Sequence, residues 1–102
     1  IISGGFNIYP KELEEIIDDQ IGVLESAVIG VPHPDFGETP IAIIVSETEI
    51  TPELEAIESN LRNSLARYKH PKKLFLIDQL PRNTMGKVQK NILREEYKSL
   101  FS

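Results

Sequence analysis

The chain has 102 residues, the length of one domain, and its hydrophobic fraction of 40% and charged fraction of 26% are typical of a soluble globular protein. The absence of cysteine excludes disulfides and thiolate metal sites, and His33 and His70 lie too far apart to form a ligand motif, so no structural metal is expected. The net charge is −5, no apolar run approaches the roughly 20 residues that cross a bilayer, and no signal peptide is evident, so we expect a cytoplasmic protein without a membrane span.

The first residues predict a hairpin followed by a helix. Ser3-Gly4-Gly5 separates two apolar stretches and is typical of a tight turn whose glycines adopt positive φ. Pro10 suits the first position of a helix over residues 10–21, which has one apolar stripe and is ended by Gly22. Because the chain opens inside this hairpin pattern and without methionine, we expect it to be a fragment of a longer protein.

Two strands and a second helix are predicted next. The runs VLESAVIGVP (residues 23–32) and IAIIVS (residues 41–46) are bounded by turn residues, and their continuous apolar character predicts a sheet covered on both faces. Thr51 as N-cap and Pro52 at the first helical position predict a helix that runs to about Arg67. Its inner side is expected to carry Leu54, Ile57, Leu61 and Leu65.

The last third predicts a strand at KLFLI (residues 73–77), a loop over residues 78–86 and a final helix. Tyr68 and Phe75 are assigned to the core. The side chains of the final helix that are expected to point inward are Ile92, Leu93, Tyr97 and either Leu100 or Phe101. The element order predicts an α+β domain, with three helices packed on a small, mainly antiparallel sheet and a β-hairpin at the N-terminus.

The charges are divided unevenly along the chain. Residues 1–66 carry 13 acidic and 2 basic side chains, whereas residues 67–102 carry 9 basic and 3 acidic ones. Such a basic segment can present a positive surface to a polyanion, or it can simply be a solvated face. A non-catalytic module that docks on nucleic acid or an acidic partner is one hypothesis, but the aromatic pattern of RNA-binding domains is missing and the acidic half would repel a phosphate backbone.

The segment PRNTMGKVQK (residues 81–90) places Lys87 directly after Gly86. A lysine is a mobile point charge with several donors for anionic oxygens, the preceding glycine leaves room for close approach, and Pro81 stiffens the base of the loop. An exposed lysine in an ordinary turn is the alternative. Ser3-Gly4-Gly5 is likewise open to interpretation as a plain hairpin turn, and His33 is expected to be a loop residue.

Three segments together resemble a known family. GGFNIYPKELE (residues 4–14), VIGVPHPDFGE (residues 28–38) and YKHPKKLFLIDQLPRNTMGKVQKNILR (residues 68–94) resemble, in this order and at these separations, the C-terminal domain of the adenylate-forming acyl-CoA synthetases. The variants GGFNIYP and PRNTMGKVQK look most like the malonyl-CoA synthetase branch. The resemblance covers nearly the whole chain and implies that a large N-terminal domain of the same parent chain binds ATP, its Mg²⁺ and the acid.

The resemblance implies a role for Lys87 in the first of two reactions. A carboxylate attacks the α-phosphate of ATP, and Lys87, at the position of the family's catalytic lysine, would offset the repulsion between these anions. The domain then swings on a hinge upstream of Ile1, and the thiol of CoA attacks the acyl-adenylate. Ser3, Gly4 and Gly5 would line the pantetheine tunnel, and Asn7 would lie near the nucleotide phosphate.

The resemblance also implies partners and leaves one of them open. The basic residues around Lys69 to Lys73 are candidates for holding the phosphates of CoA, although solvent exposure alone also explains them. Acetylation of Lys87 by a lysine acetyltransferase would remove its charge and stop adenylation. A carrier-protein thiol in place of CoA remains an alternative acceptor, and the isolated chain is expected to be inactive.

Overall fold

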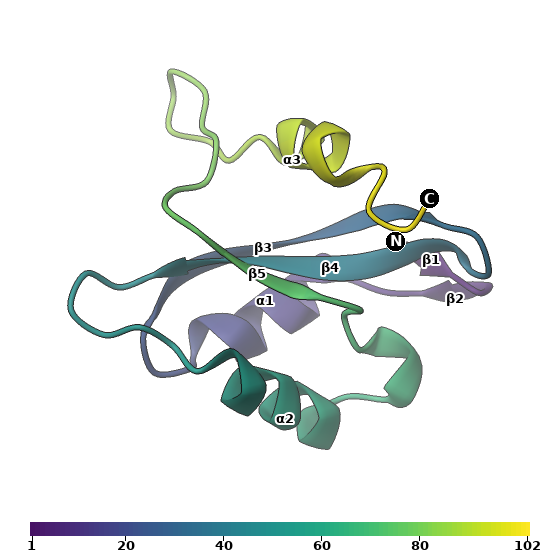
Figure 1. Ribbon diagram of the computed structural model, residues 1–102, viewed down its shortest axis with the longest axis horizontal. Coiled ribbons are helices and arrows are strands. Elements are labelled where there is room, and N and C mark those ends of the chain that lie inside the picture. The colour runs from purple at the N-terminus through teal and green to yellow at the C-terminus, as the bar shows by residue number, and fades with distance from the viewer.

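The computed structural model describes all residues from 1 to 102 and arranges them as a layer of sheet between helices (Figure 1). A short hairpin, β1 (Ile2–Ser3) and β2 (Phe6–Asn7), precedes the three-stranded sheet. The remaining elements, in chain order, are α1 (Pro10–Asp18), β3 (Val23–His33), β4 (Gly37–Ser46), α2 (Leu54–Ser64), the 3₁₀ turn η1 (Arg67–Lys69), β5 (Leu74–Ile77) and α3 (Lys90–Tyr97). The predicted α+β class with three helices is confirmed.

The main sheet has the strand order β3-β4-β5. β3 and β4 form a long antiparallel pair in which Ile29 faces Ile41 and Val31 faces Thr39. β5 runs parallel to β4, with Ala42 beside Leu74, because α2 and η1 carry the chain back to the end of the sheet where β4 began. The sheet is therefore mainly antiparallel, as predicted, with one parallel edge strand.

Both faces of the sheet are covered, as the continuous apolar strands predict. Figure 1 shows α1 and α2 on one face and α3 on the other. Side chains alternate along β4, so that Ala42 and Ile44 pack under α1 and α2 while Ile43 and Val45 pack against α3. The first core cluster includes Leu13, Ile17, Ile57 and Leu61, and the second includes Leu80 and Leu93.

The predicted start and end of α2 are wrong. The helix begins at Leu54 after an extended Glu53, and it ends at Ser64, after which Leu65 is extended and Arg67–Lys69 form η1. Thr51 and Pro52 precede the helix because the chain there packs against Gly22. A Cβ added to Gly22 would lie 2.8 Å from the Pro52 nitrogen, and Pro52 is buried. This long-range contact overrides a local capping signal.

Several smaller predictions also change. β4 begins at Gly37 instead of residue 41, and α1 ends at Asp18, with Gly22 in the turn that follows. Tyr68 is 42% exposed because its ring stacks on Phe6 outside the core, with centroids 4.8 Å apart. Ile92 is 44% exposed, since α3 turns Leu93 and not its neighbour toward the sheet. None of the helices is long and apolar enough to cross a membrane.

Candidate functional site

Lys87 lies on a tightly hydrogen-bonded loop, residues 82–88, that projects from the body of the domain (Figure 1). This segment is called the Lys87 loop below. Arg82 and Val88 form an isolated antiparallel bridge, and within it the backbone N–H of Asn83 donates to the carbonyl of Lys87 at 3.0 Å. Gly86 has φ of 81°, a conformation that L-residues adopt at a cost, so glycine at this position has a backbone reason. The loop is thus a small, ordered hairpin and not a loose connection.

The Lys87 side chain is exposed and takes part in none of the ion pairs of the chain. Its ammonium group is therefore free for an anion outside this domain. A free cation on a structured support is suited to stabilising negative charge that develops at a defined position.

The predicted Ser3-Gly4-Gly5 turn lies at a second feature, a groove of about 350 Å³ at the hairpin end of the sheet. Gly4 and Gly5 have φ of 56° and 87°, which confirms the predicted glycine turn. The Gly4 N–H donates to the carbonyl of Phe36 at 3.0 Å and so ties the hairpin to the β3–β4 turn. The residues that line the groove are Ser3, Gly4, Phe6, Phe36, Thr39, Arg67, Tyr68, His70, Pro71 and Lys72.

The groove combines apolar rings with cationic side chains. The Lys72 Nζ lies 4.6 Å from the centroid of the Phe36 ring, and Arg67 contributes a second cation to the lining. Neither cation is paired with a carboxylate. The floor holds Thr39, whose Oγ1 is buried without a hydrogen-bond partner. Such a groove is suited to a thin ligand that carries both apolar and anionic parts.

Most of the other predicted site residues lie outside the groove or have their charge paired. Gly5 and Asn7 do not line the groove, and Asn7 is exposed on β2, where it pairs with Ile2. Lys69 is paired with Glu12 at 2.8 Å, and this hydrogen bond raises the pKa of Lys69. Among the basic residues from Lys69 to Lys73, only Lys72 has its charge both free and in the groove.

The structure does not bring Lys87 and the Ser3-Gly4 turn together. In Figure 1 the Lys87 loop and the β1–β2 hairpin extend at opposite ends of the sheet. Lys87 is also absent from the lining of the groove. The domain therefore carries two separate candidate surfaces, one with a projecting cation and one with a groove.

Part of the uneven charge of the sequence is neutralised by ion pairs within the domain. Three ion pairs, Lys69–Glu12, Arg82–Glu25 and Lys90–Glu14, each join the basic part of the chain to the acidic part. These three cations are therefore paired with carboxylates, while their side chains stay partly exposed to solvent. The sequence did not indicate these pairs, nor Phe36 and Thr39 in the groove, because no local pattern links residues so distant in the chain.

No group of three or more His, Cys, Asp or Glu side chains is arranged to hold a metal ion.

Comparison with known proteins gives a consistent result. Residues 12–87 match the family described as AMP-binding enzyme C-terminal domain. The chain is 45% identical over 97 residues to the long-chain-fatty-acid–CoA ligase FadD13 of Mycobacterium tuberculosis, with 95% of this chain and 19% of that protein covered. It is 41% identical over 97 residues to the 2-succinylbenzoate–CoA ligase of Listeria monocytogenes, with 95% of this chain and 20% of that protein covered.

Solved structures agree with these relatives. The crystal structure of ATP-bound MatB from Rhodopseudomonas palustris superimposes with a TM-score of 0.96 at 53% identity, covering all of this chain and 20% of that one. A Mycobacterium tuberculosis fatty acyl CoA synthetase gives a TM-score of 0.88 at 44% identity, covering 98% of this chain and 20% of that one. The chain thus spans about a fifth of the length of the proteins it matches.

Proposed function

The chain belongs to the AMP-binding enzyme C-terminal domain family of the acyl-CoA ligases, and from this we propose that it is the mobile C-terminal domain of an ATP-dependent acid:CoA ligase. The complete enzyme would convert a carboxylate, ATP and CoA into acyl-CoA, AMP and pyrophosphate. The observation that carries the proposal is the free ammonium of Lys87 on an ordered, projecting loop. A large N-terminal domain of the same parent chain would supply most of the pocket for ATP, its Mg²⁺ and the acid.

In the first reaction Lys87 would stabilise the negative charge of the reacting carboxylate and α-phosphate. A carboxylate oxygen bonds to the α-phosphorus of ATP while the bond to pyrophosphate breaks, so two anions must approach each other. An ammonium between them offsets their repulsion and stabilises the charge that grows on the phosphoryl oxygens. A lysine on a loop with no carboxylate partner of its own loses no ion pair when it enters such a site.

In the second reaction the groove would hold the thiol substrate. The sulfur of CoA attacks the acyl carbonyl carbon and AMP leaves. Gly4 offers backbone without a side chain beside the passage, and Lys72 offers a free cation for the phosphates of CoA. We propose that Ser3 and Gly4 border the pantetheine arm in the groove, that Gly5 completes the turn beside it, and that Asn7 contacts the nucleotide phosphate in the first conformation.

The two surfaces support domain alternation. The Lys87 loop and the hairpin extend at opposite ends of the sheet, so one rigid domain would turn to present first the lysine and then the groove (Figure 1). A hinge rotation of this kind replaces one set of catalytic contacts by another without refolding either.

For the acid, we propose malonate or another short or fatty acid. The identity with MatB is 53%, whereas it is 45% with FadD13 and 41% with the 2-succinylbenzoate ligase, which supports the malonyl-CoA synthetase branch that the sequence resembles. The acceptor is proposed to be free CoA in the cytoplasm. Assays of the complete enzyme with free CoA and with a phosphopantetheinylated carrier protein separate this acceptor from the alternative. Lys87 is also the proposed target of a lysine acetyltransferase.

The test is a half-reaction assay of Lys87→Ala in the complete enzyme. Adenylate formation is expected to fall about 100-fold to 1,000-fold, the effect of losing one preorganised donor. Conversion of supplied acyl-adenylate into thioester should survive. Lys73→Ala is the matched control, since Lys73 is exposed and likewise unpaired but lies outside both the Lys87 loop and the groove. Equal damage to both half-reactions by Lys87→Ala would contradict the assigned role.

A further inference from the structure

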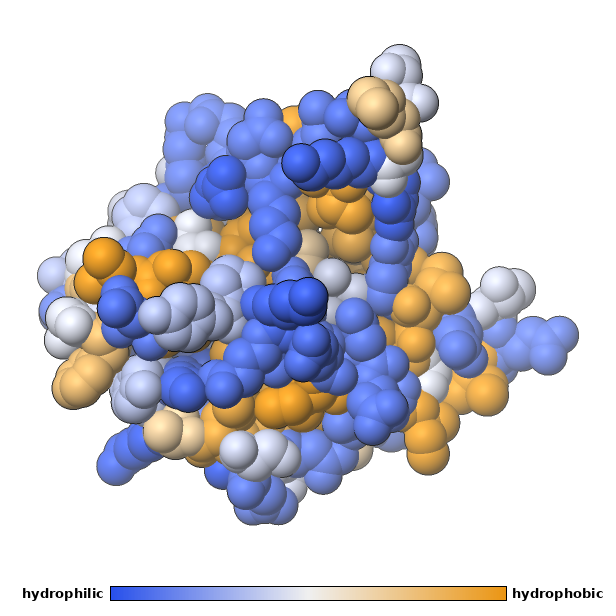
Figure 2. Space-filling view, turned by 180° about the vertical axis from the view of Figure 1, so that it is seen from behind, coloured by the Kyte–Doolittle hydropathy of each residue, from blue (hydrophilic) through white to orange (hydrophobic).

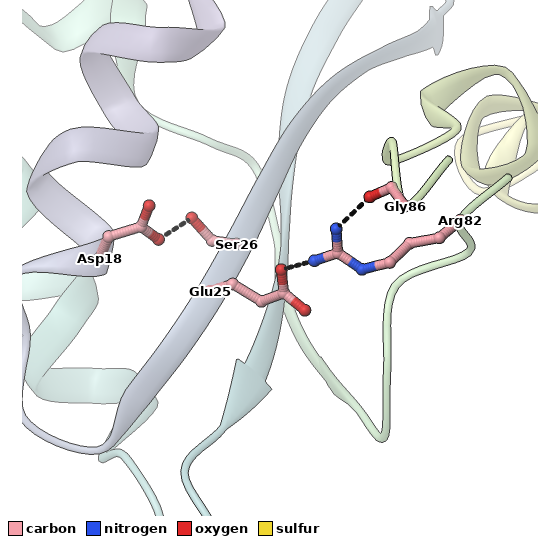
Figure 3. A network of polar contacts seen from close by, with 5 residues as sticks. All are labelled: Asp18, Glu25, Ser26, Arg82 and Gly86. Carbon is pink, nitrogen blue, oxygen red and sulfur yellow. Dashed lines mark hydrogen bonds and ion pairs between the residues drawn. The ribbon is translucent and has the colours of Figure 1, made fainter. Parts of the chain in front are cut away.

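Arg82 connects the base and the tip of the Lys87 loop to the sheet (Figure 3). Its Nη2 forms an ion pair with the Glu25 carboxylate on β3, and its Nη1 donates a hydrogen bond of 2.7 Å to the carbonyl oxygen of Gly86. Glu25 and Arg82 are separated by 57 positions in the sequence. One guanidinium therefore links the stem of the loop, its tip and a strand of the main sheet.

The Gly86 carbonyl belongs to the same peptide unit as the Lys87 N–H. That N–H donates to the Oδ1 of Asn83 at 3.0 Å, and the same oxygen accepts the N–H of Met85 at 2.9 Å. Because a peptide unit is planar, holding its oxygen from Arg82 and its N–H from Asn83 fixes the rotation of the whole plane. The peptide unit that follows Lys87 is held as well, because the Lys87 carbonyl accepts the Asn83 N–H at 3.0 Å. With the planes on both sides of its Cα held, the direction in which the Lys87 side chain leaves the backbone is fixed.

Glu25 is available for this contact because β3 is an edge strand whose neighbouring side chains face opposite sides. Ser26 faces α1, where its Oγ donates to Asp18 at 2.6 Å, while Glu25 faces the loop (Figure 3). A second link lies beyond Lys87. Lys90 pairs at 2.8 Å with Glu14, whose carboxylate also accepts the Val28 N–H of β3. Both stems of the loop are thus tied to carboxylates of the acidic half of the chain.

The surroundings of Arg82 argue against a role in stability alone. The side chains of Arg82 and Glu25 are 42% and 27% exposed, and ion pairs with such exposure contribute about 0–1 kcal/mol to folding. Arg82 and Glu25 also line an open groove, to which Leu80, Ile92 and Leu93 contribute apolar surface. Figure 2 shows a hollow with apolar atoms on a largely hydrophilic face of the molecule. The orientation of a catalytic group, in contrast, is sensitive to shifts of about 1 Å, which can cost roughly 100-fold in rate.

We propose that Arg82, held by Glu25, is a positioning residue that fixes the peptide plane before Lys87 and so aims the lysine for adenylation. This inference rests on the proposed function of Lys87. In this proposal Arg82 contacts neither the substrate nor a cofactor. It acts only through the backbone of the loop, and this makes a specific prediction about double variants.

The experiment measures both half-reactions of the complete enzyme for Arg82→Ala, Arg82→Lys and Glu25→Gln. Arg82→Ala should lower the rate of adenylate formation about 10-fold to 100-fold while the KM for ATP and the thioester-forming rate stay unchanged. Arg82→Lys keeps the charge but cannot hold both partners, so an intermediate loss is expected. Glu25→Gln keeps an acceptor and should show the smallest loss. Arg62→Ala is the matched control, because it removes a comparable exposed ion pair, with Glu58 on α2, far along the chain from the loop.

The decisive variant combines Arg82→Ala with Lys87→Ala. If Arg82 acts through Lys87, the double variant forms adenylate no more slowly than Lys87→Ala alone. Additive losses, an equal loss in both half-reactions, or an unchanged adenylation rate in a folded Arg82→Ala enzyme would each overturn the inference. These outcomes are distinct from a failure of the proposed function, which would appear as normal adenylation by Lys87→Ala itself.

Discussion

The carboxylate of Glu38 occupies the space that the missing side chain of Gly30 leaves free on the sheet. A Cβ built on Gly30 would lie 2.5 Å from a Glu38 carboxylate oxygen and 2.9 Å from its Cγ. From this position the other oxygen of Glu38 accepts the N–H of Ile2 at 2.8 Å. A glycine inside β3 thereby allows β4 to hold the hairpin that forms one wall of the groove.

Gly30→Ala is expected to push Glu38 away from Ile2 and loosen the hairpin. The lost hydrogen bond should cost about 1 kcal/mol, seen as faster hydrogen exchange of the Ile2 amide. Glu38→Ala should have the same effect, and the double variant should be no worse, because the two residues act on one contact. Glu49→Ala, which removes an exposed carboxylate without an ion pair, is the control. An unchanged Ile2 amide in Gly30→Ala would contradict this account.

Lys72→Ala is predicted to weaken the binding of CoA without affecting adenylation. The side chain lines the groove and holds its charge over the Phe36 ring, unpaired with any carboxylate. We expect the KM for CoA to rise about 5-fold to 10-fold, in keeping with the loss of one charge-assisted contact of roughly 1 kcal/mol, and the effect to shrink at high salt. Lys11→Ala, at an exposed lysine outside the groove, is the control. A lower adenylation rate with unchanged KM for CoA would count against the groove as the thiol site.

Acetylation of Lys87 is predicted to stop adenylation and spare thioester formation. The modification removes the positive charge, so an enzyme acetylated at this residue should behave like Lys87→Ala in the half-reaction assay. Exposure on the projecting loop makes the amine accessible to a modifying enzyme. Mass spectrometry of the protein from its native cells tests whether Lys87 is acetylated there. If Lys87 is never modified while other exposed lysines such as Lys11 and Lys73 are, this proposal is wrong.

Asp18→Asn is predicted to stabilise the domain at neutral pH more than at acidic pH. Desolvation by the surrounding protein raises the pKa of Asp18 above 3.8, the hydrogen bond from Ser26 opposes this, and the charge of Glu14 adds to it. A raised folded-state pKa means that the stability from Asp18 is fully present below the unfolded pKa and is lost as the pH rises through the folded pKa. Asparagine keeps the acceptor for Ser26 without the charge.

The measurement for Asp18 is the denaturation midpoint of wild type and Asp18→Asn at pH 3 and pH 7. The gain from the substitution should be larger at pH 7. Asp19→Asn, a change at the neighbouring exposed aspartate, serves as the control. A gain that is equal at both pH values, or larger at pH 3, would show that ionisation of Asp18 is not the cause.

Local patterns determined much of this protein from sequence alone. The apolar stripe after Pro10 and the continuous apolar strands predicted α1 and a sheet covered on both faces, because these signals depend on spacing along a few turns or residues. The glycine turn at Gly4 and Gly5 was predicted for the same reason. The resemblance of three segments to one family was confirmed by the comparisons.

Tertiary contacts decided what no local pattern encodes. The packing of Pro52 on Gly22 moved the start of α2, the pairing of Arg82 with Glu25 joined residues 57 positions apart, and the order of the elements set the Lys87 loop and the hairpin at opposite ends of one sheet. Periodicity and turn chemistry report only on neighbours in the chain, whereas the free energy of these contacts depends on which distant groups the folded sheet brings within reach. The sequence therefore determined that a lysine follows a glycine in a loop, and the fold decided that hydrogen bonds from Arg82 and to Asn83 order this loop.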